Sequence, residues 1–282
     1  MERMLDCRGR SLAIGGETRL IGILNVTPDS FFDGGRFGTV EKAVAHAERM
    51  AAEGAAAIDL GGQSTRPGAG DDLPEGDEIA RVVPVLERVL SAVSIPISID
   101  THRPAVARAA LAAGAHWVND VRGFQGDPEM ARVVAEFGCP VILMHWDGDF
   151  SGEPGDAIEK IKRYFARSLE IARAAGVPED RIILDPGIGF AKPPEQSLEI
   201  AGRIGELKAL GFPLLLGISR KSSIGHALGG LPPGERLEGT LATTVLAVAE
   251  GIEFVRVHDV LANLRAARTA EAVLRAKRMY AR

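Results

Sequence analysis

Short apolar segments recur along the chain, and each is bounded by Gly, Pro or Asp. Such segments, rich in Ile, Val and Leu, are typical of strands that are buried on both faces in a parallel sheet. The strands that this pattern predicts lie at residues 20–26, 56–62, 96–100, 116–120, 140–145, 181–187, 213–219 and 253–259.

The stretches between these segments are amphipathic and rich in Ala, Glu and Arg, and Gly often stands where a helix would stop. Residues 39–54, 77–93 and 103–114 are examples, and residues 260–280 form a last helix of the same kind. Strands that alternate with helices predict βαβ units and a parallel sheet. Eight such units predict closure into a (β/α)8 barrel, and an open doubly wound sheet is the structural alternative.

The chain shows no linker and no break in composition. A length of 282 residues suits one large α/β barrel domain. Residues 5–19 precede the first strand and contain Gly15 and Gly16 between short apolar runs, which indicates a small hairpin below the barrel. We therefore predict a single domain over residues 1–282, an α/β (β/α)8 TIM barrel with a short N-terminal hairpin.

Composition narrows the classes of function. Hydrophobic residues make up 46% and charged residues 25% of the chain, as in an ordinary globular protein. A net charge of −5 argues against general nucleic-acid binding, which needs a basic surface. The two cysteines, Cys7 and Cys139, indicate neither a disulfide framework nor a zinc site. The sequence contains no apolar signal-peptide core and no run near the ~18 residues of a membrane span, so we expect a cytoplasmic protein without a membrane partner.

Polar residues stand at the end of every predicted strand. In a barrel the active site is built at the C-terminal ends of the strands, so these residues are the first candidates. Individually they have simpler explanations: Asp29 and Asp259 could cap helices, Asp59 could be a polar group inside the barrel, and His145 could be a core histidine. The full set is Asn25, Asp59, Asp100, Asn119, Asp120, His145, Asp185, Ser219, Arg220, Lys221, Arg256, His258 and Asp259.

Two groups of cations indicate an anion site. Arg220 and Lys221 follow the seventh strand, at a place where barrels often bind phosphate and where a helix could begin at Ser222. Arg256 and His258 are two residues apart on the eighth strand, so both side chains point to the same face. An unpaired charge inside a barrel is unfavourable, and a bound phosphate or diphosphate would compensate it.

The remaining polar groups suit a heterocycle and a metal ion. Asp100, Asn119 and Asp185 come from three strands and would meet at one mouth, where carboxylates and an amide fit a flat ring with an amidine-like edge. Asn25 ends the first strand, which neighbours the eighth in a closed barrel. Its amide oxygen could therefore reach the same anion or a Mg²⁺ ion bound to it.

Seven motifs in this order resemble the dihydropteroate synthases of folate biosynthesis, a family of pterin-binding TIM barrels. The STRPG and SRKS motifs are specific to this family, whereas Asp-Pro-Gly alone would be weak evidence for it. The resemblance covers nearly the whole chain. It rests on ILNVTPDSFFDGG (23–35), STRPGA (64–69), NDVRG (119–123), LMH (143–145), DPGIGF (185–190), GISRKS (217–222) and VRVHDV (255–260).

The resemblance implies a transferase that joins 6-hydroxymethyl-7,8-dihydropterin diphosphate to p-aminobenzoate by an SN1-like displacement, with Mg²⁺ as cofactor. It implies pterin binding by Asp100, Asn119, Asp185 and Lys221 between the apolar walls Met144 and Phe190. It assigns the diphosphate to Asn25, Arg66, Arg256 and His258, and the metal to Asn25. It assigns p-aminobenzoate to Thr65, Arg66, Pro67, Phe190, Lys221 and Ser222. The groups expected to act in catalysis are Asp100, Asp185, Lys221 and Arg66.

Some positions depart from the family pattern, and other functions remain open. Gln63 stands where Glu is usual, Ala191 where Gly is usual and Pro193 where Thr is usual. Asp33 is a candidate for a loop that closes over the site, and Phe31 and Phe32 are either lid residues or hydrophobic packing within the loop. A pterin-binding module or methyltetrahydrofolate-type methyl-transfer domain without synthase activity is one alternative, and a Schiff-base aldolase that uses Lys221 is another. The helix predicted at 239–251 has small, apolar residues on its exposed face, and the family is usually homodimeric. We therefore predict a homodimer.

Overall fold

The computed structural model describes residues 3–26, 35–62, 73–148, 150 and 155–280. An eight-stranded parallel sheet forms its centre, with the strand order β8-β7-β6-β5-β4-β3-β10-β9. The two ends of the sheet meet at an isolated parallel bridge between Leu184 and Leu214. The strands are β3 (Arg19–Asn25), β4 (Ala57–Gly61), β5 (Ile97–Asp100), β6 (Trp117–Asp120), β7 (Val141–Met144), β8 (Ile182–Asp185), β9 (Leu215–Leu216) and β10 (Phe254–Val257).

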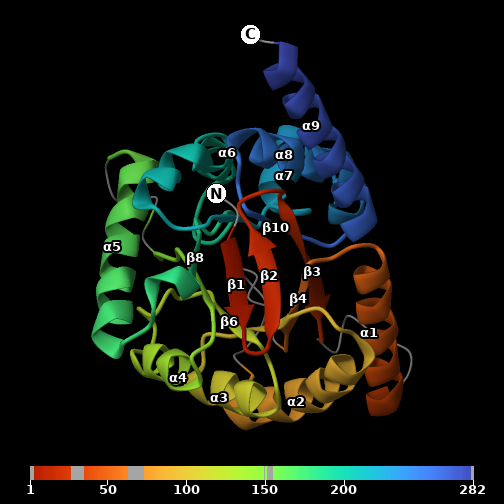
Figure 1. Ribbon diagram of the computed structural model, residues 1–282, viewed down its shortest axis with the longest axis vertical. Helices are drawn as coiled ribbons and strands as arrows, with labels where there is room; N and C mark the ends of the chain where they lie inside the picture. The colour runs from red at the N-terminus through yellow and green to blue at the C-terminus, as the bar shows by residue number, and fades with distance from the viewer. Residues whose placement is uncertain (1–2, 27–34, 63–72, 149, 151–154, 281–282) are drawn as a thin grey trace.

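Helices surround this sheet as a ring (Figure 1). Each crossover from one strand to the next contains a helix, and the bridge between Leu184 and Leu214 joins the two ends of the sheet. The (β/α)8 barrel is therefore confirmed, and the open doubly wound sheet is wrong. The α-helices are α1 (Gly35–Ala52), α2 (Glu75–Ala92), α3 (Pro104–Ala112), α4 (Glu129–Phe137), α5 (Ala157–Ala175), α6 (Pro194–Gly202), α7 (Ser222–Ala227), α8 (Leu237–Glu250) and α9 (Val260–Tyr280), and the short 3-10 helices are η2 (Glu179–Arg181), η3 (Ile204–Leu210) and η4 (Pro233–Glu235).

The strand β9 departs most from its predicted length. The run 213–219 indicates a full strand, but β9 contains only Leu215–Leu216. A Cβ on Gly217 would lie 3.4 Å from an oxygen of Asp185, so the chain passes close to the end of β8 directly after the strand. The apolar character of this run reflects burial beside the mouth of the barrel as well as strand pairing.

The predicted hairpin is present and closes the barrel from below. β1 (Arg3–Cys7) and β2 (Arg10–Ile14) pair antiparallel and lie across the middle of the ring of helices in Figure 1. Their inward residues pack in one cluster with a residue from most strands of the barrel. This cluster contains Leu5, Cys7, Leu12, Ile14, Ile21, Ala57, Trp117, Ile142, Ile183, Leu215 and Phe254.

Two arginines tie the hairpin to the helices. Arg8 donates to the carbonyl of Leu111, 2.9 Å away, and Arg10 donates to the carbonyl of Val93 at 3.2 Å. These carbonyls lie at the C-terminal ends of α3 and α2, where backbone acceptors have no helical partner and cations are favoured. The floor of the barrel is therefore closed, and the mouth on the opposite side remains for a ligand.

A larger apolar cluster fills the space between the strands and the helices.

Among the residues described, no helix combines the length and the apolar character needed to cross a membrane.

Candidate active site

The register of the sheet places three of the predicted residues in one row with Gly61. Asn25 pairs with Gly61, Gly61 pairs with Asp100, and Asp100 pairs with Asn119. Because Gly61 has no side chain, the groups on either side of it share the space that a Cβ would occupy. Oxygens of Asn25 and Asp100 both lie 3.7 Å from that point. The predicted convergence of these side chains at the mouth is confirmed.

A buried ion-pair network joins opposite sides of the barrel. The Nε of Arg256 lies 2.6 Å from Asp59 Oδ2, and a terminal nitrogen of the same guanidinium lies 2.7 Å from Asp100 Oδ2. The sequence suggested that a bound anion compensates the charge of Arg256. In the structure two carboxylates already do so, because Arg256 is long enough to reach strands on the far wall.

Asp59 is a polar group inside the barrel, as the simpler of its two sequence interpretations held. Its carboxylate is fully buried and accepts hydrogen bonds from Ser98 at 2.5 Å and from the amide of Asn119 at 2.9 Å. Together with Arg256 these donors occupy both of its oxygens. Asp59 therefore orients Asn119 and Arg256 and has little left to offer a ligand.

Two oxygens at the mouth have no partner. Asp100 Oδ1 and Asn119 Oδ1 are buried, and no hydrogen-bond donor meets them among the residues that the structure describes. Buried acceptors in folded proteins are normally satisfied, so a pair of unsatisfied acceptors on neighbouring strands indicates a ligand with two donors. The amide of Asn119 is held through its nitrogen by Asp59, which fixes its oxygen toward the mouth.

Burial dominates the electrostatics of the site. Burial, followed by the nearby carboxylate of Asp59, raises the pKa of Asp100 to about 7, against the lowering effect of Arg256. Burial also raises the pKa of Asp185, and Lys221 acts in the opposite direction. Burial lowers the pKa of Arg256, but the carboxylates of Asp59 and Asp100 outweigh this effect and keep the pKa above its ordinary value. Strongly shifted carboxyl groups at one mouth are typical of a functional site.

Asp185 and Lys221 lie on the side of the mouth formed by β8 and the chain after β9. Asp185 is buried, and one of its oxygens accepts from the backbone N–H of Gly187 at 2.8 Å. The ammonium of Lys221 donates to the carbonyl of Ile188 and lies 4.3 Å from the centre of the Phe190 ring. The loop after β8 thus brings together Asp185, Phe190 and Lys221, as the sequence predicted.

Two further predicted residues, Arg220 after β9 and His258 after β10, are held by side chains of the protein. Arg220 makes two hydrogen bonds to Asp259, at 2.8 and 2.6 Å, so this arginine is committed to a carboxylate and Asp259 is more than a helix cap. The ring of His258 lies 3.0 Å from the hydroxyl of Ser219. Helix α7 begins at Ser222, as predicted, and Ser222 is exposed.

Two of the predicted polar residues build the protein rather than the mouth. Asp120 is buried and accepts from the backbone N–H groups of Arg122 at 2.9 Å and Phe124 at 2.7 Å, which forms the turn after β6. The ring of His145 packs against Phe150 and Tyr164, with centroids 5.1 and 4.5 Å away. Burial lowers the pKa of His145 to about 2, so this histidine is a neutral core residue.

Several predicted site residues lie outside the described residues. They are Phe31, Phe32, Asp33, Gln63, Thr65, Arg66 and Pro67. The two ends of the segment that contains Thr65, Arg66 and Pro67 are described: Arg81 donates to the carbonyl of Gly62 at 2.8 Å, and Arg103 donates to the carbonyl of Leu73.

Glu78, a buried acid, holds Arg103, the residue that binds the carbonyl of Leu73. Glu78 lies 2.8 Å from Arg103 and accepts from the hydroxyl of Thr101 at 3.0 Å. Thr101 directly follows Asp100, so Arg103 and Glu78 are connected to the Asp100 side of the mouth. Sequence reasoning missed Glu78 and Arg103, because a Glu and an Arg on amphipathic helices read as solvent-exposed residues.

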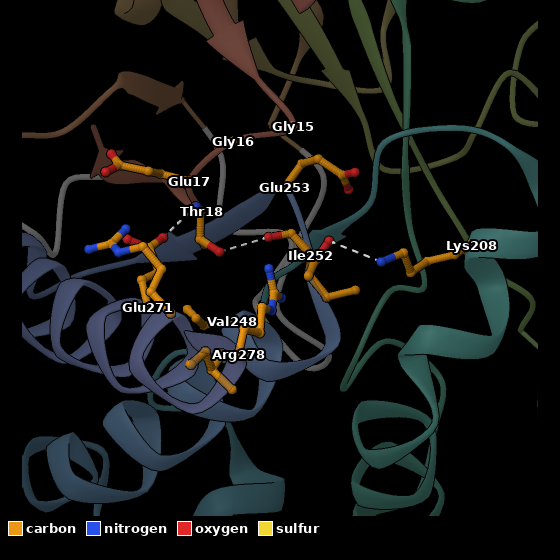
Figure 2. Close-up of a pocket in the computed structure, with 13 residues that line it drawn as sticks. Gly15, Gly16, Glu17, Thr18, Lys208, Val248, Ile252, Glu253, Glu271 and Arg278 are labelled. Carbon is orange, nitrogen blue, oxygen red and sulfur yellow. Dashed lines mark hydrogen bonds between the residues drawn. The ribbon is translucent and has the colours of Figure 1, made fainter. Parts of the chain in front are cut away.

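A separate cavity of about 490 Å³ lies at the floor of the barrel, between residues 15–18, α8 and α9 (Figure 2). Two of its polar side chains bind the protein itself. Glu271 accepts from the backbone N–H of Thr18 at 2.8 Å, and Lys208 donates to the carbonyl of Glu250 at 2.9 Å, so both groups join segments of the fold.

The fold and the mouth define a class of protein: a (β/α)8 barrel whose mouth holds buried, unsatisfied carboxyl and amide oxygens, an arrangement that suits a polar heterocyclic ligand. Comparison with known proteins agrees. The family model of the pterin binding enzymes matches residues 21–258. The dihydropteroate synthase of Clostridium beijerinckii is 47% identical over 93% of this chain and 96% of its own length.

Solved structures give the same result. The dihydropteroate synthase of Clostridium difficile, crystallised in the presence of pteroic acid, is 48% identical and superposes with a TM-score of 0.89 over 92% of this chain and 98% of its own. The Xanthomonas albilineans dihydropteroate synthase with 4-aminobenzoic acid is 42% identical, with a TM-score of 0.92 over 97% and 99% of the two chains. This chain belongs to the pterin binding enzyme family, among its dihydropteroate synthases.

Proposed function

We propose that this chain is a dihydropteroate synthase that condenses 6-hydroxymethyl-7,8-dihydropterin diphosphate with p-aminobenzoate, giving 7,8-dihydropteroate and pyrophosphate. The observation that carries the proposal is the pair of buried, unpartnered oxygens of Asp100 and Asn119 among the described residues. A pterin presents amino and ring N–H donors along one edge, which suits two such acceptors. Asp185 and Lys221 supply further polar contacts to the ring, and Met144 and Phe190 its apolar walls.

The bond that breaks joins the pterin methylene carbon to a diphosphate oxygen, and its electron pair leaves with the diphosphate. The methylene left behind is cationic, and the carboxylates of Asp100 and Asp185 stabilise it electrostatically. The amino nitrogen of p-aminobenzoate then forms the new C–N bond and releases one proton. The arylamine is neutral near pH 7, so this step needs no strong base.

The leaving diphosphate is assigned to Asn25, Arg66, Arg256 and His258. The ion pairs with Asp59 and Asp100 fix the guanidinium of Arg256 at the mouth, beside the proposed pterin site. His258 lies nearby on the chain after β10, beside Ser219. Their positive groups would stabilise the charge that develops on the departing oxygens.

The resemblance also implies Mg²⁺, and the residues at the mouth fit it in a limited way. Among the described residues, no three His, Cys, Asp or Glu side chains are grouped to hold a metal ion. The amide oxygen of Asn25 faces the mouth beside Gly61, and a hard cation with one protein ligand can complete its shell with diphosphate oxygens and water. Bound there, the ion would neutralise charge on the leaving group.

The p-aminobenzoate site is assigned to the Phe190 and Lys221 side of the mouth. Phe190 is half-buried, and its ring lies under the Lys221 ammonium, so the pair offers both an aromatic face and a positive charge to an aromatic acid. Ser222, at the start of α7, is assigned to its carboxylate. Thr65, Arg66 and Pro67 complete this assignment on the basis of the family motif.

We further propose a homodimer formed through α8 and α9. Of the large apolar side chains that are exposed in the described part of the chain, most lie on these two adjacent helices, including Leu246 at 56% and Val273 at 62% exposure. Such a patch is typical of an interface between subunits. A monomeric mass at micromolar concentration in solution would contradict the dimer.

The two buried cysteines, both unpaired, suit a reducing compartment such as the cytoplasm.

The experiment that tests the function is pyrophosphate release from the dihydropterin diphosphate with Mg²⁺, with and without p-aminobenzoate. We expect release that depends on the arylamine and yields dihydropteroate. Tight pterin binding without turnover would instead identify a pterin-binding module. Covalent trapping of a carbonyl substrate on Lys221 by borohydride would identify a Schiff-base aldolase.

A further inference from the structure

The loop after β8, residues 185–192, has a backbone that its sequence strongly constrains. Gly187, Gly189 and Ala191 have φ values of 66°, 78° and 50°, all in the left-handed region. A Cβ on Gly187 would lie 2.0 Å from the carbonyl oxygen of His145, so the loop passes directly over the end of β7. An irregular loop of this kind needs partners for its own carbonyl groups.

Lys192 supplies those partners. Its ammonium donates to the carbonyl oxygens of Gly187 at 2.9 Å, Phe190 at 3.1 Å and His145 at 3.3 Å. An ammonium has three donors, and these three carbonyls use all of them. The side chain is 7% exposed, so the contacts are shielded from water.

The same turn places three groups that contact substrate in the function proposed above. Asp185 accepts from the N–H of Gly187, the Phe190 ring lies under the Lys221 ammonium, and Lys221 donates to the carbonyl of Ile188. A shift of residues 187–190 would therefore move parts of both the pterin wall and the p-aminobenzoate wall. The loop has one further internal bond, from Gly189 N–H to the hydroxyl of Ser197 at 3.2 Å.

A charge at this position is unfavourable for stability. Burial lowers the pKa of Lys192 to about 7, and the neighbouring Lys221 lowers it as well, while Asp185 and Asp147 act in the opposite direction. The ring of Phe150 lies 5.1 Å from the ammonium. A residue that only filled space here would be apolar, since a methionine has nearly the same length and carries no charge.

We propose that Lys192 is a positioning residue: its ammonium ties Gly187 and Phe190 to the end of β7 and so fixes Asp185, Phe190 and Lys221 for substrate binding. This inference rests on the proposed function for the identity of the ligand. The holding of the loop itself does not depend on any ligand, and the two parts can be measured separately.

The test compares Lys192→Met, which keeps the length of the side chain, with Lys192→Arg, which keeps the charge. Lys160→Met is the matched control. Lys160 is also buried, at 6% exposure, donates to the carbonyl of Phe150 at 2.9 Å and lies 4.9 Å from the same ring, but it belongs to α5 and contacts no residue of the loop 185–192 in the bonds described.

Two measurements follow. Amide hydrogen exchange of residues 187–190 in the ligand-free protein reports the loop, and calorimetric titration with the dihydropterin diphosphate reports the site. We expect Lys192→Met to accelerate the exchange and to weaken binding by about tenfold, the loss of one to two net hydrogen bonds. Lys192→Arg should recover part of both effects, and Lys160→Met should reduce thermal stability without either effect.

Exchange in Lys192→Met that equals the wild-type rate would overturn the proposal, and so would accelerated exchange with unchanged binding. Wild-type protein that fails to bind the dihydropterin diphosphate would overturn the proposed function instead, and in that case accelerated exchange would still support the role of Lys192 in holding the loop.

Discussion

The mouth and the floor of the barrel both contain buried acidic groups, but within the described residues the protein supplies all hydrogen-bond donors for these groups only at the floor. At the floor, Glu271 is bound by the backbone N–H of Thr18 and by Arg268, so the protein supplies its donors. At the mouth, one oxygen of Asp100 and one of Asn119 are left without a donor in the described part of the chain. A cavity alone therefore does not identify a binding site; here two unsatisfied acceptors side by side on neighbouring strands do.

The largest effect that would test this contrast is on the ion-pair network. Arg256→Met should destabilise the protein by about 3–5 kcal/mol, because it leaves two buried carboxylates, Asp59 and Asp100, without their counter-ion. Urea unfolding of the variant and the wild type measures the change. Arg173→Met, which breaks an exposed pair with Glu179, is the control and should have little effect. A loss below about 1 kcal/mol for Arg256→Met would show that the mouth does not depend on this network.

The second effect separates function from stability. Asp100→Asn should lower kcat/KM for the dihydropterin diphosphate by about 10- to 150-fold, which corresponds to a hydrogen bond with a charged group of about 1.5–3 kcal/mol. Stability near neutral pH should fall less than in Arg256→Met, because burial and the charge of Asp59 already disfavour the ionised carboxyl group of Asp100. Steady-state kinetics and thermal unfolding on the same samples check both parts. Unchanged kcat/KM would mean that Asp100 does not contact the pterin.

The floor should show the opposite result. Glu271→Ala removes the acceptor of the Thr18 N–H and the partner of Arg268, which should cost about 1–3 kcal/mol of stability. Both KM values should stay within about twofold of the wild type, a change of under about 0.5 kcal/mol. If this variant instead raised a KM value with little loss of stability, the difference between the two faces would not hold.

The mouth should also be visible in the pH dependence of stability. The pKa of Asp100 is raised from 3.8 to about 7, so between these pH values the folded state binds more protons than the unfolded state. The contribution of this group to the free energy of unfolding therefore decreases as pH rises through that window, by at most about 1.4 kcal/mol per pH unit. Urea unfolding from pH 4.5 to 7.5 should show this slope in the wild type and a smaller one in Asp100→Asn. Identical slopes would place the titrating group elsewhere.

The smallest effect concerns Ala191, whose φ of 50° is unfavourable for a residue with a side chain. Ala191→Gly should raise stability by up to about 1 kcal/mol, because glycine adopts this conformation without strain. Chemical denaturation with several repeats can resolve such a difference. A clear loss of stability would indicate that the methyl group of Ala191 makes contacts that outweigh its backbone strain.

The sequence predicts much of the fold because buried parallel strands have a strong apolar signal. The seven longer barrel strands lie within the predicted segments or within one residue of them, and the hairpin lies slightly earlier than predicted. β9 differs because only Leu215–Leu216 of the apolar run 213–219 pair as a strand. Residues 217–219 are buried beside the mouth without strand pairing. Apolar letters report burial, and they do not separate strand pairing from other buried backbone.

The sequence predicts which residues form the site, but not which side chains bind one another there. Residues that end strands on the same side of a barrel must converge, which identifies Asp100, Asn119 and Asp185 from spacing alone. The two-residue spacing of Arg256 and His258 indicates a shared face, but it does not tell which residue of the far wall the guanidinium reaches. Lys192 gave no signal at all, because the carbonyl groups that it binds are brought together only by the left-handed turns of the loop.

The hairpin below the barrel has a consequence for synthesis. Its anchor Arg8 binds a carbonyl group that lies 103 residues later in the chain, at Leu111. At translation rates of about 5–20 residues per second, that partner is made roughly 5 to 20 s after the hairpin. The apolar side chains of Leu5 and Leu12, which end in the floor of the barrel, must stay in water or on a chaperone during this interval. The first structure to leave the ribosome therefore reaches its native contacts only after about a hundred further residues have been made.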